Sequence, residues 1–91
     1  MQNLDNQNEE ILKFPADHEF IAMGPADQAF EQLVIDTVAQ FAPVDLAQVR
    51  HRVSAQGNYW SVNVTAHIEA RPQLLSVYAA LKALPSVKWT L

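Results

Sequence analysis

The sequence predicts an α+β domain of the ferredoxin-like type, a split βαβ sandwich in which a four-stranded antiparallel sheet carries two helices on one face. The first observation is the order of local patterns, strand–helix–strand–strand–helix–strand (βαββαβ), which makes two strand–helix–strand units. Right-handed crossovers then place both helices on the same face of the sheet. The second observation is the size of the chain: 91 residues with 49% hydrophobic side chains build one compact core. We expect one domain over residues 11–91 and a flexible acidic tail over residues 1–10.

The first strand and helix are predicted around a Gly-Pro pair. Residues 19–24 indicate a strand that ends at Gly24-Pro25. Over residues 26–42, apolar side chains recur at steps of three and four, which is typical of an amphipathic helix. Pro25 suits the first helical position, and Pro43 ends the helix because the residue before a proline avoids helical geometry.

A hairpin is predicted over residues 49–68. With Gly57-Asn58 as a two-residue turn, Val53 pairs with Val62 and Arg52 pairs with Asn63. This register collects apolar side chains on one face and polar side chains on the other, and a slip of one residue would destroy that sorting.

A second helix is predicted from near Pro72 to Pro85, followed by a last strand over residues 86–91. Alternation in this strand points Val87, Trp89 and Leu91 inward and Lys88 onto the open face of the sheet.

Composition excludes several function classes. The chain has no cysteine, which removes disulfides, thiol nucleophiles and cysteine-based metal sites and favours a reducing cytoplasmic location. No apolar run reaches membrane-spanning length, so no membrane partner is expected. Residues 1–45 carry nine acidic residues and one basic residue, whereas residues 46–91 carry one acidic residue and five basic residues. We therefore expect an acidic helix on one layer and a basic strip on the other.

The open sheet face is the candidate binding surface. Its predicted residues are Arg50, Arg52, Asn63, Thr65 and Lys88. Two interpretations stay open: a sheet face that charge keeps soluble, or a docking surface for an anionic partner, including a second copy of the chain.

The predicted turn is a second candidate for binding. Gly57 and Asn58 expose backbone amides there, and Tyr59 lies beside them, although an ordinary hairpin explains the same residues.

The sequence indicates neither catalysis nor a metal or other cofactor. His18, His51 and His67 lie on different strands without ligand spacing, and we expect them to be structural or surface residues. Ser54 and Ser61 have no histidine and acid arranged to activate them. We therefore predict that the protein is not an enzyme.

Several segments together resemble one bacterial family. They are Ile11-Leu12-Lys13-Phe14-Pro15, Ala22-Met23-Gly24, Ser54-Ala55-Gln56-Gly57-Asn58-Tyr59-Trp60-Ser61-Val62, Tyr78-x-x-Leu81 and Val87-x-x-x-Leu91. On these residues the chain resembles the YbeD-like family, a domain family of unknown function, over about residues 10–91. Family members have lysine before the turn glycine, where this chain has Gln56, so an anion-binding role for that lysine does not carry over.

The resemblance implies an ACT-like, ferredoxin-like domain similar to the regulatory domains of metabolic enzymes such as phosphoglycerate dehydrogenase. Fold alone does not determine function. We expect a cytoplasmic regulatory or adaptor domain, a homodimer that binds a small anionic metabolite or a protein partner. The alternative is an RNA-binding module that uses the basic sheet face, but the acidic pI of 5.1 does not favour nucleic acid.

Overall fold

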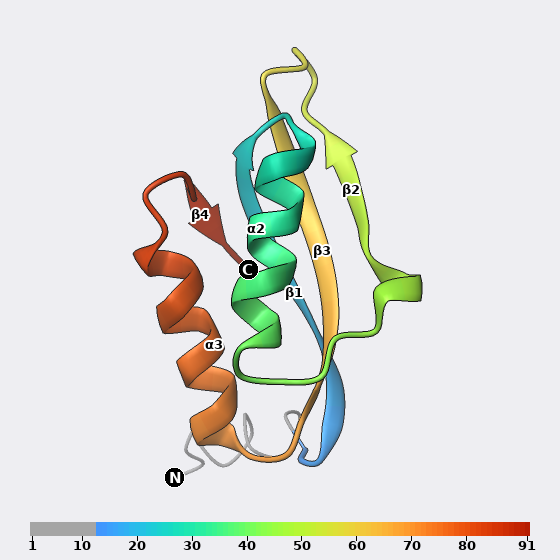
Figure 1. Ribbon diagram of the computed structural model, residues 1–91, viewed down its shortest axis with the longest axis vertical. Coiled ribbons are helices and arrows are strands. Elements are labelled where there is room, and N and C mark those ends of the chain that lie inside the picture. Colours follow the sequence, from blue (N-terminus) through green and yellow to red (C-terminus); the bar gives the residue numbers. More distant parts are fainter. Residues whose placement is uncertain (1–12) are drawn as a thin grey trace, which may run out of the picture.

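The protein is described by a computed structural model for residues 13–91, and the predicted fold class is confirmed (Figure 1). The predicted tail and the segment Ile11-Leu12 lie outside the described residues. The elements are β1 (Ala16–Pro25), α2 (Gln28–Ala39), the short 3₁₀ helix η1 (Leu46–Gln48), β2 (Arg50–Val53), β3 (Tyr59–Ile68), α3 (Arg71–Ala83) and β4 (Trp89–Thr90).

The four strands form one antiparallel sheet in the order β2-β3-β1-β4. β1 and β3 are the central strands and pair along ten residues, from Ala16 opposite Ile68 to Pro25 opposite Tyr59. The two helices pack over one face of the sheet (Figure 1), which leaves the other face uncovered within residues 13–91. Neither helix of this described part is both long and apolar enough to cross a membrane.

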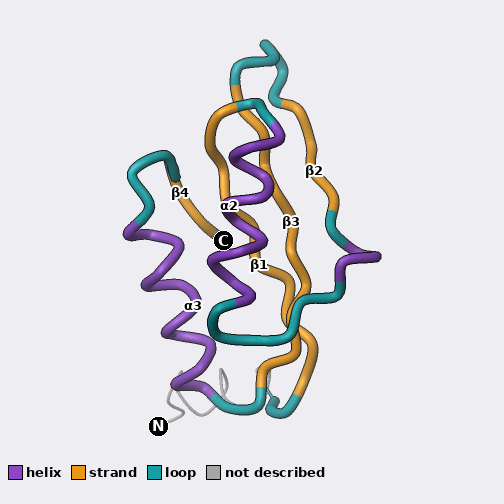
Figure 2. Tube along the Cα trace, viewed as in Figure 1, coloured by secondary structure: helices purple, strands orange, loops and turns teal. Residues whose placement is uncertain are grey.

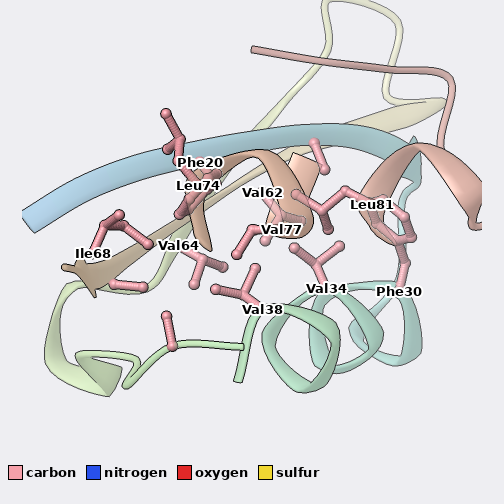
Figure 3. Packing of buried hydrophobic residues seen from close by; sticks show 13 residues of the cluster. Phe20, Phe30, Val34, Val38, Val62, Val64, Ile68, Leu74, Val77 and Leu81 are labelled. Carbon is pink, nitrogen blue, oxygen red and sulfur yellow. The ribbon is translucent and has the colours of Figure 1, made fainter. Parts of the chain in front are cut away.

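The core lies between the sheet and the helices (Figure 3). Every second residue of the central strands points into it, because side chains alternate between the two faces of a strand. Each helix contributes residues at steps of three and four. The core residues are Phe20, Ala22, Phe30, Val34, Val38, Ala42, Val62, Val64, Ala66, Ile68, Leu74, Val77 and Leu81.

The start of α2 differs from the prediction. Pro25 is the last residue of β1 and not the first residue of the helix, which begins at Gln28. Asp27 caps the helix, since its side chain accepts a hydrogen bond from the backbone N–H of Phe30 at 2.7 Å. A carboxylate that satisfies a free N–H of the first turn decides where a helix begins.

The predicted hairpin register is wrong by two residues. Arg52 lies opposite Ser61 and Val53 opposite Trp60, so a loop over residues 54–58 connects the strands in place of the two-residue turn. The loop projects beyond the sheet (Figure 2). Within it, Gly57 has a φ of 80° and donates its N–H to the Ser54 oxygen at 2.9 Å. Because two residues are one full period of a strand, the shift leaves every side chain on its predicted face.

The inward orientation predicted for Trp89 and Leu91 is also wrong. Lys88 donates its N–H to the Met23 oxygen at 2.7 Å, and Trp89 is the register partner of Met23. Two residues thus oppose one, which is the arrangement of a β-bulge. Val87 packs against the core, but the extra residue reverses the alternation, and Trp89 and Leu91 are 44% and 62% exposed.

Candidate ligand-binding surface

The open face of the sheet carries a hollow of about 470 Å³. Its lining comes from all four strands, and the register of the strands shows which residues lie side by side. Arg52, Ser61, Met23 and Trp89 form one row across the sheet. The hollow is lined by Ile21, Arg50, His51, Arg52, Ser61, Asn63, Trp89 and Leu91.

The two sides of the hollow differ in chemistry. On the β2 side stand the guanidinium groups of Arg50 and Arg52, and on the β4 side stand the apolar side chains of Trp89 and Leu91. The hydroxyl of Ser61 and the amide of Asn63 lie between them on β3. Ile21 of β1 lies between β3 and β4. A hollow with cations on one side and apolar side chains on the other suits a ligand that has both an anionic group and an apolar body.

Glu19 neutralises part of the basic strip. Its Oε2 accepts from a guanidinium nitrogen of Arg50 at 3.0 Å and from the Asn63 amide nitrogen at 3.1 Å. Arg52 makes no ion pair within residues 13–91, so it supplies the uncompensated positive charge of the hollow. The alternating pattern predicts Arg50 and Arg52 on one surface, but it does not show that a carboxylate of β1 shares that surface.

The other predicted site residues do not line the hollow. Thr65 is buried in the sheet beside Glu19, one row away from Asn63. Lys88 lies on the open side with its Nζ 5.5 Å from the centre of the Tyr59 ring. Tyr59 is 37% exposed. Gly57 and Asn58 lie in the exposed loop between β2 and β3.

Five residues of the hollow were not among the predicted site residues, namely Ile21, His51, Ser61, Trp89 and Leu91. Alternation in β1 and β3 already assigned Ile21 and Ser61 to the open face, so the signal for these two was present. Trp89 and Leu91 were missed because a bulge leaves no mark in a strictly alternating pattern.

The three histidines lie apart from one another. The His18 Nε2 bonds the Tyr78 hydroxyl at 3.0 Å, and burial lowers the pKa of His18 and raises that of Tyr78. His51 stacks on Trp60 on the helix side of the sheet, with ring centres 3.6 Å apart. The hydrogen bond that the His67 ring donates to the Asp17 carboxylate raises the pKa of His67, with Glu69 adding to the shift. Among residues 13–91, no three His, Cys, Asp or Glu side chains are grouped to hold a metal ion.

Comparison with known proteins identifies the family of the chain. A family described as "Protein of unknown function (DUF493)" matches residues 9–91. The chain belongs to this family. Among its members, a UPF0250 protein of Paraburkholderia phytofirmans is 35% identical over 86 residues, covering 93% of this chain and 97% of the relative. A UPF0250 protein of Janthinobacterium sp. is 35% identical and covers 100% of both chains. The predicted YbeD-like membership is confirmed.

A solved structure supports the fold independently of sequence. The solution structure of protein HP0495 from H. pylori superposes with a TM-score of 0.67 and covers 88% of this chain and 85% of its own. The two sequences are 15% identical. This likeness shows that the DUF493 chain shares the α+β fold of HP0495.

Proposed function

We propose that the chain is a cytoplasmic regulatory or adaptor domain that acts by binding, in the manner of an ACT-type domain, and not by catalysis. The observation that carries this proposal is the hollow on the open sheet face, where Arg52 and Trp89 stand at opposite ends of one row that runs through Ser61 and Met23. Such a site takes an anionic group at Arg52 and an apolar group at Trp89. Its ligand is a small anionic metabolite or an acidic group of a protein partner.

Thermal unfolding in the presence of a panel of anionic metabolites tests the proposal. A ligand present at 100 times its Kd stabilises the folded state by about 2.7 kcal/mol, which raises the Tm by several degrees. The shift should disappear in Arg52→Ala and in Trp89→Ala, and persist in Arg71→Ala, which removes an exposed cation of α3. No shift with any anion, or shifts that survive both substitutions, would contradict a metabolite site in the hollow.

We further propose that the chain self-associates along β4. This edge strand exposes Trp89 and Leu91, two large apolar side chains. Static light scattering at several protein concentrations should show a mass above 10.2 kDa that falls towards the monomer value in Leu91→Lys. A monomer at every concentration would end this part of the proposal.

RNA binding is the second candidate, favoured by the exposed Trp89 in a hollow that also holds Arg52 and by the ring of Tyr59 near Lys88. Exposed aromatic rings on such sheets can stack with unpaired bases. Filter binding of single-stranded RNA at low salt tests it. Retention should weaken as salt increases and vanish in the double variant Arg50→Glu/Arg52→Glu, and failure of the wild type to bind would exclude it.

A further inference from the structure

We propose that the outer edge of β2 accepts an extended acidic segment of a partner protein as a fifth strand of the sheet. The inference rests on the proposed function and names one class of partner for it. β2 is the end strand of the sheet, and no other strand of residues 13–91 pairs with its outer side. It lies along the edge remote from α3 (Figure 1), and all four of its residues are exposed.

The backbone of β2 offers free hydrogen-bonding groups at two residues. The Ser54 N–H donates to the Tyr59 oxygen at 2.9 Å. Because ladder bonds in an antiparallel pair recur at every second residue, Arg52 and Arg50 also bond towards β3. The N–H and C=O groups of His51 and Val53 therefore point outward, where a partner strand would satisfy them.

The side chains of β2 determine the chemistry of that partner. Arg50 and Arg52 stand on the open face about 7 Å apart, the spacing of alternate residues in a strand. A strand added beside them places its own alternate side chains directly opposite. An acidic side chain opposite Arg52 makes a stabilising cross-strand pair, and one opposite Arg50 shares that guanidinium group with Glu19. On the other face Val53 is 52% exposed and favours an apolar residue opposite it. The fitting segment is therefore acid–x–acid with a neighbouring β-branched residue.

Charge argues against a second copy of the chain at this edge. An antiparallel pairing of two β2 strands that is centred on His51 and keeps both open faces on one side sets Arg50 of each copy opposite Arg52 of the other. Like charges directly opposite one another destabilise a strand pair. β2 thus differs from the apolar edge at β4, which carries no such pair of like charges.

Two peptides of equal composition test the proposal. Both carry an N-terminal fluorescein: Thr-Val-Glu-Thr-Glu-Val-Thr alternates its acids, whereas Thr-Val-Thr-Glu-Glu-Val-Thr turns one acid to the other face. Fluorescence anisotropy should show that the alternating peptide binds about two- to fivefold more tightly, the value of one cross-strand charge pair. Equal affinities would overturn the proposal.

A backbone variant tests the mode of binding. Val53→Pro removes an N–H that points outward and no bond to β3, which an edge strand tolerates. It should weaken the alternating peptide about fivefold and leave the Tm near that of the wild type. Undiminished binding in the folded variant would overturn strand addition.

If Val53→Pro does not fold, hydrogen exchange in the wild-type protein tests strand addition at β2 instead. Saturating peptide should slow exchange at the amides of His51 and Val53, and unchanged exchange at both amides would overturn the proposal. Anions that still raise the Tm through Arg52 and Trp89 would leave the proposed function standing even when the peptide fails.

Discussion

At the scale of single residues, Gly24 shows how closely α2 and the loop before β4 approach the strand β1. A Cβ added there would meet the ring of Phe30 and would lie 2.8 Å from the backbone oxygen of Ser86. Phe30 is buried in the core and cannot turn away without disturbing its neighbours. Only glycine lets α2 and the loop before β4 pack against β1 at this point.

We predict that Gly24→Ala lowers the free energy of unfolding by about 1–3 kcal/mol, the usual cost of overpacking a core. Urea denaturation followed by circular dichroism measures the loss. The matched control is Ala29→Gly on the exposed side of α2, which should cost about 1 kcal/mol through helix propensity alone. An unchanged midpoint for Gly24→Ala would contradict the close contact.

His18 makes the stability depend on pH. Burial lowers its pKa from 6.5, so between that value and the lowered one the unfolded chain binds more protons than the folded chain. Stability from this residue is therefore lost as the pH falls below about 6.5. His18→Gln keeps a hydrogen-bonding group for the Tyr78 hydroxyl but does not titrate, and urea midpoints between pH 7 and pH 5 should fall less steeply in this variant.

His67 provides the opposite control. Its pKa is raised, chiefly by Asp17, so its contribution is full below pH 6.5 and is lost as the pH rises through the raised value. His67→Asn should therefore steepen the loss of stability on acidification. If His18→Gln and His67→Asn change the pH profile in the same direction, the assignment of the two shifts is wrong.

At the scale of elements, Asp27 decides where α2 begins. Its carboxylate accepts from the Phe30 N–H, and no other side chain within residues 13–91 caps this end. We predict that Asp27→Ala lowers the free energy of unfolding by about 1 kcal/mol. Asp27→Asn keeps the accepting oxygen and should lose less free energy of unfolding. Thermal melts of both variants measure the two losses. Equal losses in the two variants would show that charge, and not the hydrogen bond, stabilises the helix start.

The strand elements show what alternation can and cannot predict. It places Phe20, Ala22, Val62 and Val64 in the core, because a two-residue period sorts the faces of any regular strand. It failed at β4, where one extra residue opposite Met23 reversed the pattern. A bulge depends on hydrogen bonds to a strand more than sixty residues away in the chain, which local sequence does not reveal.

At the scale of the whole molecule, the core and the candidate surface lie on opposite faces of one sheet. We predict that Arg52→Ala and Trp89→Ala change the free energy of unfolding by less than about 1 kcal/mol, since both side chains are exposed. Leu81→Ala, in the core, should cost about 2–5 kcal/mol. Chemical denaturation of the three variants checks this separation, and a large loss in Arg52→Ala would assign that residue a structural role.

The amino-acid sequence by itself determined the fold class, the two helices and the assignment of Arg50, Arg52 and Asn63 to the open face. These follow from periodicity and from proline and glycine positions, which act over a few neighbouring residues. Only the tertiary structure decided the hairpin register, the bulge before Trp89 and the pairing of Arg50 with Glu19. Each depends on contacts between segments distant in the chain. These contacts turn a basic strip into a hollow that has Arg52, which makes no ion pair among residues 13–91, on one side and an aromatic ring on the other.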